Sequence, residues 1–403
     1  MYEFLFLCLG IFLTSVFFWS KAPVAFEVPK VIFFQWFVRI LVMVFGITFL
    51  AKKGKWKIKN RLLIPILIFT VWATATALLG GDIAKSFAGN FFRQDGLITF
   101  YELVGFSVLV SYFWKNEFKK MISSTIFLSV SFLSSWALIE TINHGFTLGS
   151  AATFGNPVFL AGYLVCGLPF VYYFLRQIKL NLILKLLLFL LPVLTIVLTQ
   201  ASAAVAVMFI YLGVLAMSLA KKKYSYLFLM MGFVASFLIT FFWLKDFSKE
   251  KLMSSQGRDR IYHRVIVGAL KKPVTGWGWA NVDYAFESNY WPLKVDHDVY
   301  VDKAHSQLLE VFTTTGFPGL VIYVYLFYVF FVELKNNYKK SADKLWNFTI
   351  ISTVCLYILH SQTNIISITE EILFWLVMGI TLSESVGNQV QPASHGRRLK
   401  PRP

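Results

Sequence analysis

The feature that most limits the fold of this chain is a series of apolar runs, each about as long as a membrane is thick. A helix needs about 20 mostly apolar residues to cross the hydrocarbon core of a bilayer. With 57% hydrophobic residues and a mean hydropathy of +0.64, the 403-residue chain is too apolar for a soluble domain. The sequence therefore predicts an all-α, polytopic integral membrane protein of about twelve transmembrane helices, at residues 2–20, 31–51, 61–80, 97–114, 121–140, 156–175, 182–200, 202–220, 224–244, 316–334, 346–363 and 369–385.

The first apolar run resembles a retained helix more than a secretory signal peptide. It has no basic segment before it and no small-residue cleavage site after it, although a signal peptide remains the alternative. Asn156 and Pro157 predict the start of the sixth helix, with the asparagine as its cap. The three cysteines, Cys8, Cys166 and Cys355, fall inside separate apolar runs, where they are most simply small hydrophobic residues.

Positive charge predicts the orientation of these helices, because Lys and Arg in short loops stay on the cytoplasmic side. Alternate connections are basic, so both termini are expected in the cytoplasm, and we interpret residues 1–385 as one membrane domain and 386–403 as a cytoplasmic basic tail. The formal charge of +17 then reflects topology and attraction to anionic lipid, and needs no nucleic-acid partner. The basic segments are 51–61, 115–120, 176–185, 221–223, 335–344 and 395–403.

One long connection, residues 245–305, is expected outside the cytoplasm between the ninth and tenth helices. Within it, Ile261, Val265 and Ala269 recur at helical spacing, which predicts a short amphipathic helix on the outer membrane surface. The arginines of this stretch are Arg258, Arg260 and Arg264. Guanidinium groups there suit bidentate binding of phosphate, but nonspecific contact with lipid is the alternative for each arginine taken alone.

The end of this loop, "DHDVYVDKAH" (296–305), gathers acidic and histidine side chains. A divalent metal site built from Asp296, His297, Asp298, Asp302 and His305 is conceivable, but the spacing matches no familiar ligand pattern, so we expect no metal. His305 alone could simply cap the helix that follows. The sequence lacks a phosphate-binding glycine loop followed by Lys, GxSxG, HExxH and CxxC, which leaves acid–base chemistry or binding.

Four segments together resemble the O-antigen ligase and polymerase superfamily. "DKAHSQLLEVFTTTGFPGLVIY" (302–323) has the family's Ala-His pair and its Gly-x-x-Gly-Leu helix start, and "GRDRIYHRVIVGALKKPVTGWGW" (257–279) is similar to its loop helix and Pro-x-x-Gly-x-Gly turn. "ATFGNPVFLAGYL" (152–164) and "FFRQDGLIT" (91–99) resemble two further elements. The twelve-helix layout also fits, so the resemblance spans roughly residues 90–335.

The resemblance implies a glycosyltransferase of the outer face of the bacterial cytoplasmic (inner) membrane. Such enzymes transfer a glycan from a polyprenyl diphosphate carrier to a glycan, lipid or protein acceptor, and need no cofactor. His305 would be the general base and Arg258 would bind the diphosphate, with Arg93, Arg260 and Arg264 as further candidates. Asp302 and Lys303 would support the histidine.

Two departures from the family pattern, and one other class of function, bear on this interpretation. Ser202 stands where the family commonly has an arginine, so one expected phosphate ligand is missing, and Ser306 replaces the usual asparagine after the histidine. Ligase, polymerase and protein O-glycosyltransferase remain open. A transporter of lipid-linked glycan is the alternative, but transporters usually place polar groups at mid-membrane and often have two related halves.

Overall fold

The computed structural model describes residues 2–51, 60–145, 149–219, 258–289 and 301–387. These residues form helices and connecting turns, with no strand among them, so the all-α prediction is confirmed. Eleven of the twelve apolar runs are helices, and the ninth run, 224–244, lies outside the described residues. The helices are α1 (Tyr2–Val16), α2 (Glu27–Ala51), α3 (Leu63–Leu78), α4 (Ile83–Ala88), α5 (Leu97–Phe113), α6 (Lys119–Asn143), α7 (Pro157–Gln177), α8 (Leu182–Leu198), α9 (Ser202–Leu219), α12 (Arg258–Lys271), α13 (Val282–Glu287), α14 (Gln307–Lys340), α15 (Lys344–Ser361) and α16 (Ile368–Gly387), with 3₁₀ turns η1 (Asn116–Phe118) and η2 (Ala152–Phe154).

Five of the described helical segments are long and apolar enough to cross a membrane. Several others are shorter, such as α1 with 15 residues, which at 1.5 Å per residue reaches only part of the way across a hydrocarbon core about 30 Å thick. The structure therefore supports a membrane protein, while the total of twelve spanning helices remains a prediction. The five segments are Glu27–Ile47, Asn116–Asn143, Pro157–Gln177, Ser202–Leu219 and Gln307–Lys339.

Helix starts follow the local sequence. The Asn156 side chain accepts a hydrogen bond from the backbone N–H of Val158, and Pro157 occupies the first turn of α7, as predicted. Asp343 caps α15 in the same way by accepting from the N–H of Trp346. Each cap satisfies a backbone donor that the helix itself leaves unpaired.

α14 begins at Gln307, nine residues before the start predicted for the tenth apolar run, and it is broken at Gly316. Gly316 has φ of 71°, and a Cβ atom built there would lie 2.1 Å from the Val274 carbonyl oxygen. The turn after α12 therefore packs directly against the break, where Phe317 N–H donates to the Pro273 carbonyl at 2.7 Å. Only glycine accommodates both the left-handed φ and the close approach.

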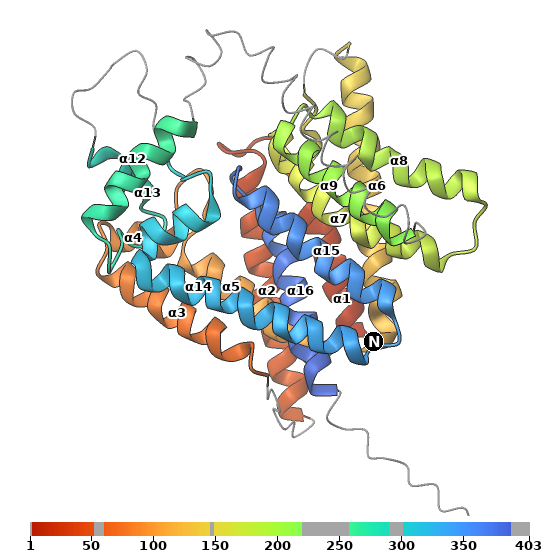
Figure 1. Cartoon of the computed structure of the whole chain (residues 1–403), viewed down its shortest axis with the longest axis horizontal. Coiled ribbons are helices and arrows are strands. Elements are labelled where there is room, and N and C mark those ends of the chain that lie inside the picture. Colours follow the sequence, from red (N-terminus) through yellow and green to blue (C-terminus); the bar gives the residue numbers. More distant parts are fainter. Residues whose placement is uncertain (1, 52–59, 146–148, 220–257, 290–300, 388–403) are drawn as a thin grey trace, which may run out of the picture.

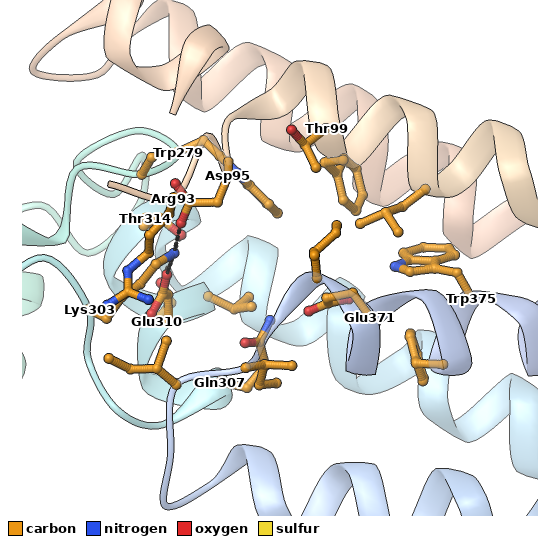
Figure 2. A pocket seen from close by; sticks show the side chains of 18 of the residues that line it. Arg93, Asp95, Thr99, Trp279, Lys303, Gln307, Glu310, Thr314, Glu371 and Trp375 are labelled. Atoms are coloured by element: carbon orange, nitrogen blue, oxygen red, sulfur yellow. Dashed lines mark hydrogen bonds and ion pairs between the residues drawn. The ribbon is translucent and has the colours of Figure 1, made fainter. Parts of the chain in front are cut away.

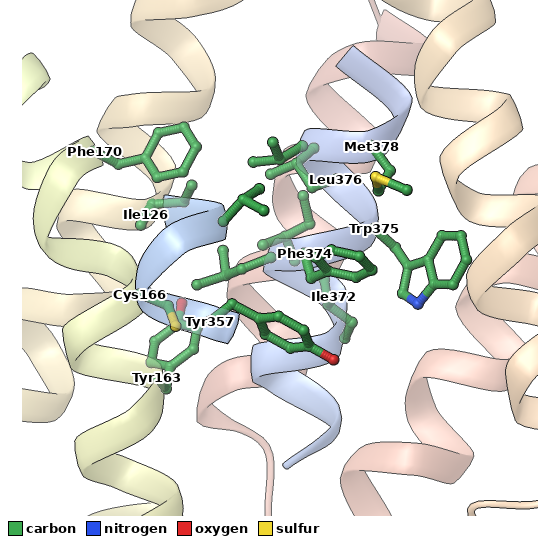
Figure 3. Close-up of a cluster of buried hydrophobic side chains, with 14 of the residues drawn as sticks. Ile126, Tyr163, Cys166, Phe170, Tyr357, Ile372, Phe374, Trp375, Leu376 and Met378 are labelled. Carbon is green, nitrogen blue, oxygen red and sulfur yellow. The ribbon is translucent and has the colours of Figure 1, made fainter. Parts of the chain in front are cut away.

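The core of the bundle surrounds α16. Its side chains from Ile372 to Met378 are buried, and the helix packs along α5, α7 and α15. Figure 3 shows Phe374 and Tyr357 face to face in this core, with ring centroids 4.4 Å apart, and Cys166 on α7 nearby. Since the interior around this stretch is apolar, residues 372–378 of α16 are hydrophobic on every face.

Two of the basic connections lie at one end of the bundle, and the residues implicated by the family resemblance lie at the other. Asp343, which follows α14, contacts Lys119 of the 115–120 connection at 3.6 Å and accepts from Tyr173 near the end of α7 at 2.9 Å. At the opposite end of α5 and α14, Arg93 contacts Asp302. The basic segments 115–120 and 335–344 therefore meet at one end of the bundle, and the residues implicated by the family resemblance meet at the other.

This separation makes the predicted membrane orientation testable. In a variant lacking the native cysteines, we expect a membrane-impermeant thiol reagent applied to intact cells to label Lys271→Cys at the end of α12. The reagent should not label Lys179→Cys, which follows α7. Both positions are exposed, but they lie at opposite ends of the bundle, so only one of them is expected outside the cytoplasm. The reverse labelling pattern would contradict the orientation.

Candidate active site

α12 forms a small second core with the segment that precedes α14. Ile261 and Val265 are buried with Val282 and Phe286 of α13 and with Val301 and Ala304. Ile261, Val265 and Ala269 share one face of the helix, as predicted, but that face is buried against protein, whereas the sequence predicted that the helix lies on the outer membrane surface. Figure 1 shows α12 and α13 together at one edge of the molecule, close to α4 and the start of α14. This packing brings the arginine-bearing helix α12 to the histidine-bearing segment.

His305 itself has an uncommon backbone conformation. Its φ is 53°, in the left-handed region that costs a non-glycine residue of order 1–3 kcal/mol. The Tyr262 hydroxyl of α12 donates to the His305 carbonyl at 3.2 Å, and the Ser306 hydroxyl donates to Gln362 Oε1 at 3.2 Å. The N-cap residue of α14 is Ser306, so the alternative that His305 is the helix cap does not match this geometry.

The connection before α5 holds the histidine segment through ion pairs. Arg93 Nε donates to Asp302 Oδ2 at 2.5 Å, with both side chains less than one-fifth exposed. The Lys303 ammonium pairs with Asp95 and, at 2.6 Å, with Glu310 Oε1 of α14 (Figure 2). Burial by itself would lower the pKa of Lys303, but the charges of Asp95 and then Glu310 outweigh it and hold that pKa above its usual value. Lys303 therefore stays charged and holds Asp95 and Glu310 together through its two ion pairs.

Replacing Lys303 tests how much its ion pairs contribute to the free energy of unfolding. Lys303→Met leaves two carboxylates close together with little exposure to water, so we expect a loss of about 3–5 kcal/mol in the free energy of unfolding. Thermal or denaturant unfolding of the purified protein measures it. Adding Asp95→Asn to Lys303→Met should recover part of the loss, because it removes one of the two uncompensated charges. The control Lys115→Met removes an exposed ion pair with Glu117 and should change the free energy of unfolding little. Equal stability of Lys303→Met and the unsubstituted protein would contradict a stabilising role of the Lys303 ion pairs.

Two guanidinium groups act electrostatically on His305. Arg258 at the start of α12 donates to Asn364 Oδ1 at 2.9 Å, in the turn between α15 and α16. Burial lowers the pKa of the His305 imidazole from 6.5 to about 4; the Arg258 charge also lowers it, Asp302 opposes, and Arg93 adds to the lowering. The imidazole is therefore uncharged at neutral pH and able to accept a proton.

A cavity of about 130 Å³ lies beside this cluster, between α2, α3, α5, α14, α15 and α16. Lys303 and Ser306, on either side of His305, both line it, as does Arg93. Figure 2 shows Arg93, Asp95, Lys303 and Glu310 grouped on one side of the cavity and Glu371 and Trp375 on the other. A proton acceptor, two cations and a concave space thus converge at one end of the bundle, as in a site for acid–base chemistry.

A family comparison covers part of this arrangement. Residues 187–324 match the Wzy_C family model, O-antigen ligase. The match includes Arg258 and His305 and confirms the resemblance to the O-antigen ligase and polymerase superfamily. Arg93 and Asn364 lie outside the matched residues. No curated protein sequence gives a significant match to the chain.

The other residues singled out in the sequence lie elsewhere, or their side chains are outside the described part of the chain. Arg264 packs its guanidinium 5.3 Å from the centre of the Phe286 ring on α13. Arg260 lies in α12, but its side chain is outside the described part of the chain. Ser202, at the position of the family arginine, begins α9. Of the proposed metal ligands, Asp302 is bound by Arg93, and Asp296, His297 and Asp298 lie outside the described residues.

Asp95, Glu310 and Asn364 were not predicted from the sequence to belong to the site. Asp95 lies within the motif around Arg93, and Glu310 follows Lys303 by seven residues, so a search for carboxylates near the predicted cations could have found both. Asn364 has no comparable signal, because it lies 106 residues after its partner Arg258. Asp95 and Glu310 hold Lys303, and Asn364 accepts a hydrogen bond from Arg258.

Proposed function

We propose that the protein transfers a glycan from a polyprenyl diphosphate carrier to an acceptor hydroxyl or amide at the outer face of the cytoplasmic membrane. The match to the O-antigen ligase family supports glycan transfer of the ligase or polymerase type. In this proposal the protein is a multi-pass inner-membrane enzyme with both termini in the cytoplasm. The loop 245–305 faces outward, where nucleotide sugars are not available and an activated donor must arrive anchored in lipid.

The observation that carries the proposal is the environment of His305. An uncharged imidazole lies near two guanidinium groups, in the segment that matches the family. The acceptor oxygen gives its proton to His305 and bonds to the anomeric carbon of the donor sugar. The bond from that carbon to the diphosphate oxygen breaks, and the diphosphate leaves with the electron pair. His305 can then pass its proton to the departing phosphate.

The two arginines would bind and neutralise the diphosphate in place of a metal ion. Arg258 is the principal candidate, because its described partner, Asn364, is neutral and leaves the guanidinium charge uncompensated by that contact. Arg93 is already paired with Asp302, so it would bind phosphate through its remaining N–H groups. Arg93 lies near enough to act on His305, and it is therefore our candidate to replace the family arginine missing at Ser202.

The pH dependence of transfer tests the role of His305. The lowered pKa predicts that kcat/KM persists as the pH falls below 6.5 and is lost near pH 4, when the imidazole of the unliganded enzyme becomes protonated. Arg258→Gln removes one cause of the lowering, so the acidic limb of its profile should move to higher pH, measured as relative transfer between pH 4 and 8. Acidic limbs centred at pH 6.5 in both proteins would contradict the assignment.

A deletion strain complemented with the unsubstituted gene or with His305→Ala tests the function as a whole. Loss of a glycan transferase should leave lipid-linked glycan unprocessed, and only the active gene should restore transfer. Unattached polymer, short oligomers or unglycosylated protein in the deletion strain would identify a ligase, a polymerase or a protein glycosyltransferase, respectively. Full restoration by His305→Ala would favour the transporter alternative instead.

A further inference from the structure

The turn that joins α15 to α16 contacts both the segment that carries the histidine and the helix that carries the arginines. Gln362 Oε1 accepts a hydrogen bond from the Ser306 hydroxyl at 3.2 Å, and Asn364 Oδ1 accepts one from Arg258 at 2.9 Å. This turn lies beyond the residues that match the family model. It therefore brings to the site two side chains that the family match does not cover.

The first turn of α14 takes its cap from another helix. Ser306 is the N-cap residue and has the extended backbone typical of that position, but its side chain makes no capping hydrogen bond among the described residues. Its hydroxyl donates to Gln362 instead, and the same Gln362 oxygen accepts from the N–H of Leu308, in the first turn of α14, at 3.4 Å. A helix leaves such N–H groups unpaired at its start. Gln362 therefore performs the capping that Ser306 does not.

His305 directly precedes this cap, and its backbone needs support from neighbouring groups. A left-handed φ of 53° is strained in a non-glycine residue and persists only where the surroundings hold it. The Tyr262 hydroxyl donates to the His305 carbonyl at 3.2 Å, and Gln362 holds the next residue, Ser306. A change in the backbone at Ser306 would redirect the imidazole, because the backbone sets the direction in which a side chain leaves it.

Gln362 is itself held in place, so it can fix the position of its partners. Its Nε2 donates to the Ser361 hydroxyl at 2.9 Å and to the Ile358 carbonyl at 3.3 Å. The two helices on either side of the turn are joined by a fully buried pair, in which His360 Nδ1 lies 2.7 Å from Glu370 Oε1. A supporting residue holds a catalytic group precisely only when its own conformation is fixed in this way.

We propose that Gln362 is a positioning residue for glycan transfer, which caps α14 from a neighbouring helix and so keeps the His305 imidazole directed at the acceptor. This role rests on the proposed function, in which His305 is the general base. Gln362 acts on the reaction through Ser306 and the start of α14, and not by touching a substrate.

Another helix of the same chain shows how the dependence on Gln362 can be removed. Asn156 begins α7 with nearly the same backbone as Ser306, with φ of −138° against −150° and ψ of 120° against 121°. The Asn156 side chain accepts from the N–H of Val158, two residues later, at 2.9 Å. Ser306→Asn should likewise give the N–H of Leu308 a local acceptor, so the start of α14 should then depend less on Gln362.

Transfer kinetics with the purified full-length protein and extracted donor test this role. Gln362→Met keeps the length of the side chain but removes the acceptor. The turnover number should fall by about 10- to 100-fold, as for a misplaced catalytic group, while donor binding changes by less than about twofold. Gln362→Glu keeps an acceptor and should retain most of the turnover. In the Ser306→Asn background, Gln362→Met should cost much less turnover. Gln177→Met, at the exposed end of α7, is the matched control and should have no effect.

Hydrogen exchange at the start of α14, measured by mass spectrometry, reports on the cap without the transfer reaction. Gln362→Met should speed exchange of the Leu308 N–H by about fivefold, the factor expected for one net hydrogen bond, and Ser306→Asn should restore its protection. Gln362→Ala replaces Gln362→Met in both measurements if the latter does not fold.

Four results would overturn the positioning role of Gln362: unchanged exchange, unchanged turnover, an equal loss of turnover in both backgrounds, or a loss of donor binding as large as the loss of turnover. Exchange at Leu308 does not depend on transfer, so the cap and the transferase can fail separately. Full transfer by His305→Ala would contradict the general base and leave the exchange result intact, whereas unchanged exchange in Gln362→Met would contradict the cap and leave the transferase proposal intact.

Discussion

Replacing His305 with alanine is expected to lower the turnover number for glycan transfer by about 10² to 10⁴, while binding of the lipid-linked donor stays close to that of the unsubstituted protein. The reason is that the imidazole accepts a proton only as the new bond forms, so it contributes to the transition state and little to donor binding. Steady-state kinetics with purified protein and extracted donor, together with a separate donor-binding assay, measure the two effects independently.

His263→Ala is the matched control for this variant. His263 lies on α12, the helix that also carries Arg258, but it is exposed. Removing it tests for any general effect of losing an imidazole near the site, and transfer should be unchanged. If His305→Ala retained full transfer in a folded, membrane-inserted protein, general-base catalysis by His305 would be wrong. If it lost donor binding as severely as turnover, the histidine would instead contribute to the shape of the site.

Arg258→Ala is expected to weaken donor binding by about 10- to 100-fold, the range for hydrogen bonds to charged groups, and also to lower turnover. The guanidinium would contact the diphosphate before the reaction and neutralise the charge that develops as it leaves, so both steps depend on it. Arg258→Lys should rescue only partly, because an ammonium group keeps the charge but cannot make a bidentate contact. Donor titration at fixed ionic strength measures the loss.

A second variant separates phosphate binding from a structural role of Arg258. The guanidinium also holds Asn364, so a purely structural arginine would act through that contact. Asn364→Ala removes the contact and keeps the charge, and it should leave donor binding much stronger than Arg258→Ala does. Equal losses of donor binding in the two variants would contradict the phosphate role. Lys272→Ala, next to the end of α12, controls for the loss of a nearby positive charge.

Local sequence features were sufficient to predict the helices and several of their boundaries. Apolar runs near membrane length placed eleven helices of the described chain, because each helix satisfies its own backbone hydrogen bonds. Asn156 and Pro157 predicted the start of α7, and the spacing of Ile261, Val265 and Ala269 predicted a helix with one apolar face, although not that protein would cover this face. The motifs predicted a resemblance to the O-antigen ligase and polymerase superfamily, and the match of the O-antigen ligase family model to residues 187–324 confirms it. These features depend on residues close together in sequence, where periodicity and capping are informative.

The tenth apolar run was predicted to begin at residue 316, and α14 is broken into two helices at Gly316, so the predicted start coincides with the start of the second of them. Gln307, Glu310 and the threonines at 313–315 belong to a first, more polar helix that hydropathy did not predict. The hydroxyl groups of these threonines donate to carbonyls one turn earlier, and Glu310 pairs with Lys303. Hydropathy reports where a helix meets lipid, and a helix can extend beyond that zone where tertiary contacts satisfy its polar side chains.

By itself, the sequence determined the secondary structure, the membrane class and the identity of the candidate base, since each follows from composition, spacing or a local motif. Only the tertiary structure decided which groups surround that base. Asp302 pairs with Arg93, 209 positions earlier in the chain, and Arg258 reaches Asn364, 106 positions later. The cavity is likewise lined by residues of six helices, from Glu27 on α2 to Trp375 on α16. Which side chains become partners depends on how the helices pack, and packing depends on the shapes of all the helix faces together. A local sequence pattern therefore does not predict these partners.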